Sequence, residues 1–134
     1  MIAQCSGAAF ASRGEMCLQA LKQVIEFQMP AATEEKKIKV QQFYHAKDNG
    51  IAGLGKVIMY QKDYVMQNSA MAADIITHWL SLLPINHDME EGYQQYDILA
   101  MMFQADPAYV MGPDNRNLQQ VIKIFADVLD AKYL

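Results

Sequence analysis

The fold class is decided by the stretch DIITHWLSLLP, residues 74–84. Its apolar side chains recur at the three- and four-residue spacing of one face of an α-helix. Pro84 cannot continue a helix, and Asn68 or Ser69 can cap the start of one. The sequence therefore predicts a helix from about Ala70 to Leu83. Its apolar face consists of Ile76, Trp79, Leu80 and Leu83.

Four further helices are predicted by the same spacing, on either side of that stretch. They run from about Glu15 to Gln28, Glu34 to Tyr60, Met89 to Gln104 and Asn117 to Ala131. Their inward faces are, in the same order, Leu18, Leu21, Val24 and Ile25; Val40, Phe43, Tyr44, Ile51, Leu54 and Ile58; Tyr93, Tyr96, Leu99, Ala100 and Phe103; and Leu118, Val121, Ile124, Phe125 and Val128. Because good helix formers dominate and only 7 Gly and 4 Pro are present, we expect an all-α fold.

Residues at the expected helix ends support these boundaries. Pro30 ends the first helix, and Thr33 can cap the second. Asp88, three residues before Glu91, resembles a capping box at the start of the helix that follows Pro84. The turn signal Gly112-Pro113-Asp114-Asn115 precedes the last helix.

Three glycines lie inside the predicted long helix, at Gly50, Gly53 and Gly55. Each costs roughly 1 kcal/mol relative to alanine in a helix, so a neighbouring helix is expected to approach closely there. A break near residues 48–50 is the alternative. The segment Gly53-Leu54-Gly55-Lys56 is not a phosphate loop, because Val57 stands where Ser or Thr is required and no strand precedes it. We therefore predict no nucleotide cofactor.

The apolar pattern repeats along the chain. Ile76, Trp79, Leu82 and Leu83 recur 42 residues later as Leu118, Val121, Ile124 and Phe125, and the same offsets begin at Leu18. The apolar faces of the intervening helices also repeat, with a shift of 45 residues that relates Ile51 to Tyr96. Two helices in a period of this length are typical of HEAT and armadillo repeats, whose units span roughly 40 to 47 residues. The predicted units are about 13–60, 68–105 and a partial 115–134. On pattern alone, a plain helical bundle is the alternative.

Composition narrows the class of protein. The chain has 134 residues, of which 52% are hydrophobic and 19% charged, so it can bury a core. A net charge of -4 disfavours nucleic acid as a partner. No apolar run reaches the roughly 18 residues of a membrane helix, so we expect no membrane insertion. About two and a half repeats without polar caps also predict a single segment cut from a longer solenoid.

Several stretches together resemble one family. These are Asp48-Asn49-Gly50-Ile51-Ala52-Gly53-Leu54-Gly55-Lys56-Val57-Ile58, the segment His78-Trp79-Leu80-Ser81-Leu82-Leu83-Pro84, the pairs His87-Asp88 and Glu90-Glu91, and Val110-Met111-Gly112-Pro113-Asp114-Asn115-Arg116-Asn117-Leu118. In order and spacing they resemble the importin beta-3 type of karyopherin-beta nuclear transport receptor, from about Leu18 to Ala126. The chain departs from that family at Pro30-Ala31-Ala32-Thr33 and at Asp97, where the family tends to have Asn.

This resemblance implies a C-terminal HEAT-repeat segment of a right-handed α-α superhelix. It implies a nuclear import receptor that carries cargo through the nuclear pore under Ran-GTP control and shuttles between cytoplasm and nucleus. The expected partners are basic cargo proteins and the GTPase Ran, with nucleoporins as further candidates. The expected mechanism is binding, without catalysis.

In that family the second helix of each unit lines a concave surface that holds partners. The polar residues of these helices that avoid the apolar stripes are Gln42, His45, Asn49, Glu90, Glu91, Gln94 and Asp97. Gln94 is the repeat equivalent of Asn49. Their amides and carboxylates could accept hydrogen bonds from Lys or Arg of a basic partner. A solvated helix face is the alternative for any one of them.

No residue pattern points to catalysis or to a metal. His45, His78 and His87 are scattered without a second ligand at metal spacing, and Cys5 and Cys17 have no evident activating base. Glu90 and Glu91 fit the first turn of a helix, where the helix dipole favours acids. Two functional alternatives stay open: a HEAT scaffold of another assembly, and a self-contained helical domain with a ligand pocket or an enzymatic site.

Overall fold

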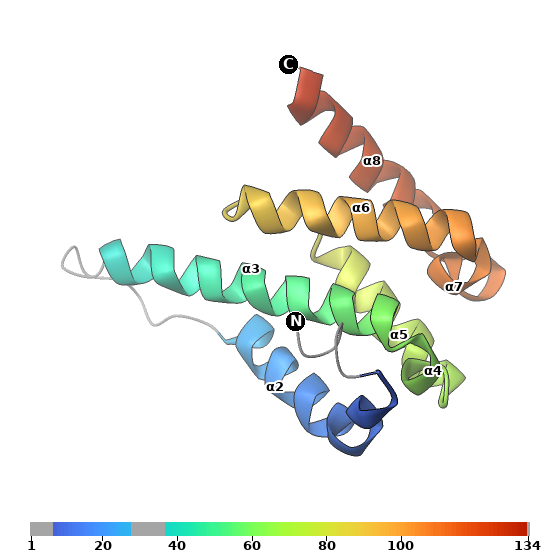
Figure 1. Ribbon diagram of the computed structural model, residues 1–134. Coiled ribbons are helices and arrows are strands. Elements are labelled where there is room, and N and C mark those ends of the chain that lie inside the picture. Colours follow the sequence, from blue (N-terminus) through green and yellow to red (C-terminus); the bar gives the residue numbers. More distant parts are fainter. Residues whose placement is uncertain (1–6, 28–36, 134) are drawn as a thin grey trace.

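A computed structural model describes residues 7–27 and 37–133, and these residues form helices and no strand. The prediction of an all-α fold is confirmed. In chain order the elements are η1 (Gly7–Arg13), α2 (Gly14–Glu26), α3 (Lys37–Tyr60), α4 (Lys62–Val65), α5 (Ser69–Ser81), α6 (Met89–Ala105), α7 (Pro107–Met111), η3 (Pro113–Asn115) and α8 (Leu118–Tyr133) (Figure 1).

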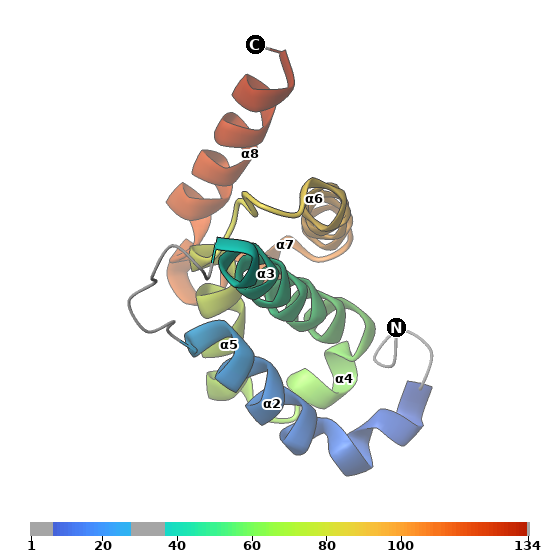
Figure 2. The ribbon, with the colours of Figure 1, turned by 90° about the vertical axis from the view of Figure 1, so that its left-hand side faces the viewer.

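The long helices lie in two layers. Helices α3 and α6 run side by side in one layer, while α2, α5 and α8 form the other (Figures 1 and 2). Helix α3 contacts α2, α5 and α6, and α5 also contacts α8. In Figure 1, α2, α5 and α8 run from right to left, and α3 and α6 run back. The two complete predicted units therefore each contribute their first helix to one layer and their second helix to the other, and α8 of the partial unit joins the first helices.

The helix boundaries differ from the predicted ones by a few residues. Helix α2 ends at Glu26 rather than Gln28, and α5 ends at Ser81 rather than Leu83. The earlier end of α5 has a local cause, because Leu82 and Leu83 donate to carbonyls only three residues back before the chain reaches Pro84. Helix α3 continues through residues 48–50, so the alternative of a break there is wrong. The predicted features at Pro30, Thr33, Glu34 and the side chain of Val40 lie outside the described residues.

The caps of α5 and α6 are confirmed. The side chain of Asn68 accepts from the Met71 backbone N–H at 3.1 Å, and that of Asp88 accepts from the Glu91 N–H at 3.1 Å. The reciprocal half of the predicted capping box is wrong. The backbone N–H of Asp88 donates to Asp48 of α3 instead, at 2.9 Å, so the loop before α6 is held from outside its own helix.

The glycines of α3 lie where neighbouring helices approach, as predicted. A β-carbon added at Gly50 would lie 3.1 Å from Val24 of α2, and one at Gly53 would lie 2.9 Å from Leu21 of α2. At Gly55 it would meet the amide oxygen of Gln95 and the indole nitrogen of Trp79. The intrinsic helix cost of these glycines is thus offset by close packing on two sides of α3.

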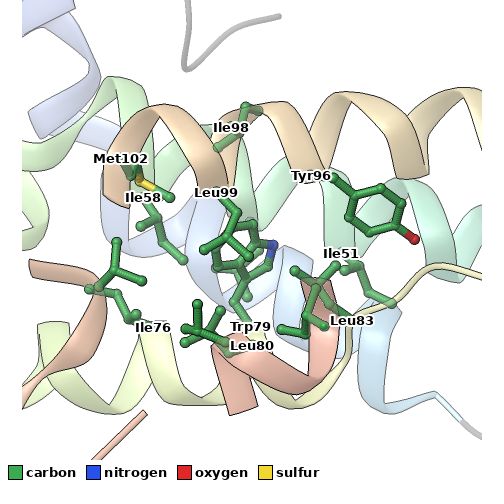
Figure 3. Packing of buried hydrophobic residues seen from close by; sticks show 14 of the residues in the cluster. Ile51, Ile58, Ile76, Trp79, Leu80, Leu83, Tyr96, Ile98, Leu99 and Met102 are labelled. Carbon is green, nitrogen blue, oxygen red and sulfur yellow. The ribbon is translucent and has the colours of Figure 1, made fainter. Parts of the chain in front are cut away.

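The core lies between α3, α5 and α6 (Figure 3). Trp79 of α5 is fully buried at its centre, with Ile58 of α3 and Leu99 of α6. The indole Nε1 donates to Gln95 Oε1 at 3.1 Å, and Gln95 Nε2 donates to the Ala52 carbonyl at 3.2 Å. A buried amide that uses both ends in this way links all three helices without an unpaired polar group.

Four residues predicted to face inward are exposed, and those predictions are wrong. Tyr44, Tyr93 and Leu118 each lie on a helix surface that no other described helix covers, and Val24 is 41% exposed at the edge of its contact with Gly50 of α3. Spacing along one helix identifies an apolar face, but it does not reveal whether a neighbour is present to cover that face. Among the described residues, these positions therefore mark the open sides of the stack.

Two short helices, α4 and α7, have no counterpart in the predictions, since four or five residues are too few for a periodic pattern. In α7, Tyr109 donates its hydroxyl to the Ile58 carbonyl at 2.7 Å, near the end of α3. Asp106 caps α7 and pairs with Lys62 Nζ at 2.7 Å. This segment thus satisfies a carbonyl that the end of α3 would otherwise leave without a partner.

Ionisation of the buried tyrosines is expected to be delayed at alkaline pH. Burial, and then the nearby Asp106 charge, raise the pKa of Tyr109, and burial raises the pKa of Tyr96. A raised folded-state pKa means that the stabilisation is present below the unfolded value, near 10, and is lost as the pH rises above it. An ultraviolet absorbance titration should show a late tyrosinate component that appears together with unfolding. If all seven tyrosines titrate together while the helices persist, this expectation is wrong.

Candidate protein-binding face

The buried carboxylate of Asp48 sets the position of α6 on α3. Its side chain is only 7% exposed, and Oδ2 accepts from the backbone N–H groups of His87 and Asp88 at 3.1 and 2.9 Å. Both donors belong to the loop that leads into α6. Two hydrogen bonds to a charged, poorly solvated acceptor are stronger than ordinary ones, so this contact fixes where α6 begins.

Side chains around that anchor extend the contact toward the surface. The rings of Tyr44 and His87 stack with centroids 4.3 Å apart and an interplanar angle of 6°. His45 Nδ1 lies 3.7 Å from a carboxylate oxygen of Asp88. The first half of α3 and the start of α6 are therefore joined by a stacked pair and by polar contacts.

Lys56 and Glu91 form the next contact along the two helices. Lys56 Nζ lies 3.6 Å from Glu91 Oε2, and both side chains are mostly buried. That oxygen is inaccessible to solvent and makes no hydrogen bond in the described part of the chain. The interaction is therefore an ion pair shielded from solvent, in which the charge attraction is offset in part by the cost of burying both charges.

Six of the seven predicted site residues are exposed on α3 or α6. On α3, Gln42, His45 and Asn49 are exposed and follow each other at three- or four-residue spacing. On α6, Glu90, Gln94 and Asp97 are likewise exposed at that spacing. Glu91 differs, since it turns toward α3 and pairs with Lys56. We call the seven predicted residues, together with Lys56, the α3–α6 polar face: Gln42, His45, Asn49, Lys56, Glu90, Glu91, Gln94 and Asp97.

Three residues that shape this face were not identified from the sequence: Asp48, Lys56 and Asp88. Asp88 was predicted only as a helix cap and not as a neighbour of His45. One signal was available for Asp48, because it lies on the apolar stripe of α3 between Tyr44 and Ile51. A lone acid within an apolar stripe indicates a buried acceptor with partners from elsewhere in the chain. Lys56 carries no comparable signal, since its partner is known only once α6 is placed.

A second polar joint holds α8 against α5. The side chain of Asn117 is buried, accepts from the Thr77 hydroxyl at 3.1 Å and donates to the Val110 carbonyl at 3.0 Å. The exposed Arg116 guanidinium donates to Thr77, to the Ala73 carbonyl and to Asp74. The predicted turn at residues 112–115 is confirmed, with positive φ at Gly112, Asp114 and Asn115.

A groove of about 460 Å³ separates α2 from α5. Leu18, Ile25, Leu54 and Ile75 form its apolar lining, and His78 lies at its edge. Cys17 lies next to Leu18 in α2, and burial raises the pKa of its thiol. A raised pKa reduces the reactive thiolate fraction at neutral pH.

Within residues 7–27 and 37–133, no three His, Cys, Asp or Glu side chains gather as metal ligands would. Over the same residues, no helix combines the length and apolar character needed to cross a bilayer.

No family model matches the chain, and no solved structure matches it. The geometry of the helices and of the α3–α6 polar face therefore carries the functional argument, together with the sequence resemblance described above.

Proposed function

We propose that this chain is a protein-binding HEAT-repeat segment of a karyopherin-beta nuclear import receptor, and that the α3–α6 polar face binds Lys- and Arg-rich segments of partner proteins. The observation that carries the proposal is the exposure of polar side chains along the two second helices, which the Asp48 contact holds side by side. Exposed carboxylates and amides arranged along two such helices can accept from several cationic side chains of one extended partner.

Two features support the receptor assignment in particular. The residues that carry the resemblance also occupy the joints of the stack. Asp48 holds α6 on α3, Trp79 occupies the core centre, and Asn117 holds α8 on α5. In addition, the first and second helices of the units separate into two layers, as the helices of a solenoid do.

Peptide binding tests the face itself. A fluorescein-labelled peptide rich in Lys and Arg is titrated with the chain, and anisotropy is followed at low and moderate salt. The variant Glu90→Lys with Asp97→Lys is expected to weaken binding about tenfold, because two exposed carboxylates are reversed in charge. The matched control is Glu15→Lys with Asp130→Lys, which changes the net charge equally on α2 and α8 and should bind as the parent does. If both double variants lose affinity equally, binding follows net charge and the face has no special role.

Nucleotide selectivity tests the receptor assignment against a general scaffold. Native protein captured with an antibody against this chain is offered Ran loaded with GTP or with GDP. A receptor under Ran-GTP control should retain the GTP form selectively, because the two forms must differ in affinity for nucleotide exchange to control cargo release. Equal retention of both forms, or retention of neither, would favour a HEAT scaffold of another assembly.

A further inference from the structure

The two ends of the helix stack carry matching exposed stripes. Met16, Ala20, Val24 and Phe27, along α2 and at its C-terminal cap, are exposed, although Val24 also borders Gly50 of α3 and the Phe27 ring contacts Phe43 of α3. Helix α8 presents Leu118, Ile122, Ala126 and Leu129. Both stripes follow the same offsets of 0, 4, 8 and 11 residues, and neither contains a charged residue. Helix α2 lies at one end of the stack and α8 at the other (Figure 1). We call them the α2 stripe and the α8 stripe.

The internal repeat indicates what covers such a stripe. Ile76 and Leu80 of α5 are buried, at 2% and 0% exposure, in a helix that contacts α8. Their equivalents 42 residues later, Leu118 and Ile122, are 41% and 59% exposed. The α8 stripe is therefore the surface that the next first-layer helix would occupy, as α8 occupies it on α5.

The same comparison identifies the helix face that packs against such a stripe. Helix α8 meets α5 through Asn117, whose side chain accepts from Thr77, and through Gln120, which donates to the Leu80 carbonyl. By the shared apolar offsets, in which Leu118 corresponds to Leu18, Gln120 corresponds to Ala20 of α2 and Ile124 to Val24. The α2 stripe thus includes Ala20, the counterpart of the residue through which α8 contacts the helix before it.

We propose that two copies of this chain bind head to tail, with the α2 stripe of one copy packed on the α8 stripe of the other. The partner helix then takes on α8 the place that α8 takes on α5, and the two-layer stack continues across the contact. Both stripes are apolar and uncharged, so their contact buries apolar surface without stranding a charge. Because the two surfaces differ, the contact is heterologous and can add further copies as the concentration rises. This inference does not depend on the proposed receptor function.

Sedimentation equilibrium from about 5 to about 200 µM tests the proposal through mass action. The average mass should rise with concentration from the 15.1 kDa of one chain to at least about twice that value. Ala20→Glu blocks the α2 stripe and Ile122→Glu blocks the α8 stripe. Both positions are exposed, so the variants should fold, which circular dichroism checks. Met101→Glu places the same charge on an exposed position of α6 and should associate as the parent does.

Mixing the two blocked variants gives the decisive result. Each variant alone should stay monomeric, because every head-to-tail contact needs both stripes. The equimolar mixture should form a complex of about two chains, since each variant retains one intact stripe that fits the other. The proposal is overturned if the parent stays monomeric throughout, if either variant alone still associates, or if the mixture remains monomeric.

Discussion

Replacing Trp79 with alanine is expected to lower the free energy of unfolding by about 3–5 kcal/mol. The indole is fully buried between α3, α5 and α6, so its removal leaves a cavity whose walls lose their contacts. It also removes the donor to Gln95 Oε1, which is itself buried. Since small domains are stable by only about 5–15 kcal/mol, the variant should be close to its limit of stability. Urea unfolding followed by circular dichroism measures the change.

Trp79→Phe separates the two contributions. It keeps most of the apolar volume and removes the donor, so a loss of about 1–3 kcal/mol is expected from the unsatisfied amide oxygen. Adding Gln95→Leu removes that oxygen as well and should restore part of the loss. A cost below about 1 kcal/mol for Trp79→Ala would contradict the central position of the indole in the core.

Gly55→Ala is expected to destabilise the fold by about 1–3 kcal/mol, although alanine is intrinsically the better helix former. The added methyl group would overlap the Gln95 amide oxygen and lie 2.8 Å from the Trp79 indole nitrogen. Both neighbours are fully buried and joined by a hydrogen bond, so neither can move without breaking that contact. Thermal and urea unfolding of the variant measure the effect.

Gly53→Ala is the matched control, two residues away in the same helix. Its methyl group would meet the end of the Leu21 side chain, which is only partly buried and can rotate away. The gain in helix propensity, roughly 1 kcal/mol, should then make this variant neutral or more stable. If Gly53→Ala and Gly55→Ala have the same effect, the helix propensity of alanine decides the outcome and the packing at Gly55 does not.

The long helices could be predicted from the sequence because their apolar residues obey a local rule. Trp79, Leu99 and Ile124 each share a face with neighbours three or four positions away, so short windows contain the whole signal. The short helices α4 and α7 have too few residues to show that spacing. Helix α7 is fixed by Asp106 at its start and by the contact between Tyr109 and Ile58, which lies 51 residues earlier in the chain.

The buried polar residues could not be predicted, since their partners lie about one repeat away. Asp48 accepts from Asp88 across 40 residues, Gln95 donates to Ala52 across 43, and Asn117 accepts from Thr77 across 40. In a local window Gln95 and Asn117 look like part of a solvated surface, and the position of Asp48 in an apolar stripe indicates burial without identifying its partners. They become buried and hydrogen-bonded only when one unit stacks on the next.

The candidate site was predictable to the level of helix faces. Gln42, Asn49 and Gln94 are exposed, as residues that avoid an apolar stripe should be. The orientation of Glu91 was beyond the reach of spacing, because it depends on how α6 is rotated against α3 and on the reach of Lys56.

The two joints of the stack should differ in mechanical stiffness. The contact between α3 and α6 depends on Asp48 and Gln95, which are buried, so water competes less for their hydrogen bonds. The joint between α5 and α8 depends in part on Arg116, whose exposed bonds to Thr77 and Asp74 can be exchanged for bonds to water at little net cost. A bending force applied to α8 would therefore change the angle between α8 and α5 at Arg116, while α3 and α6 keep their relative position.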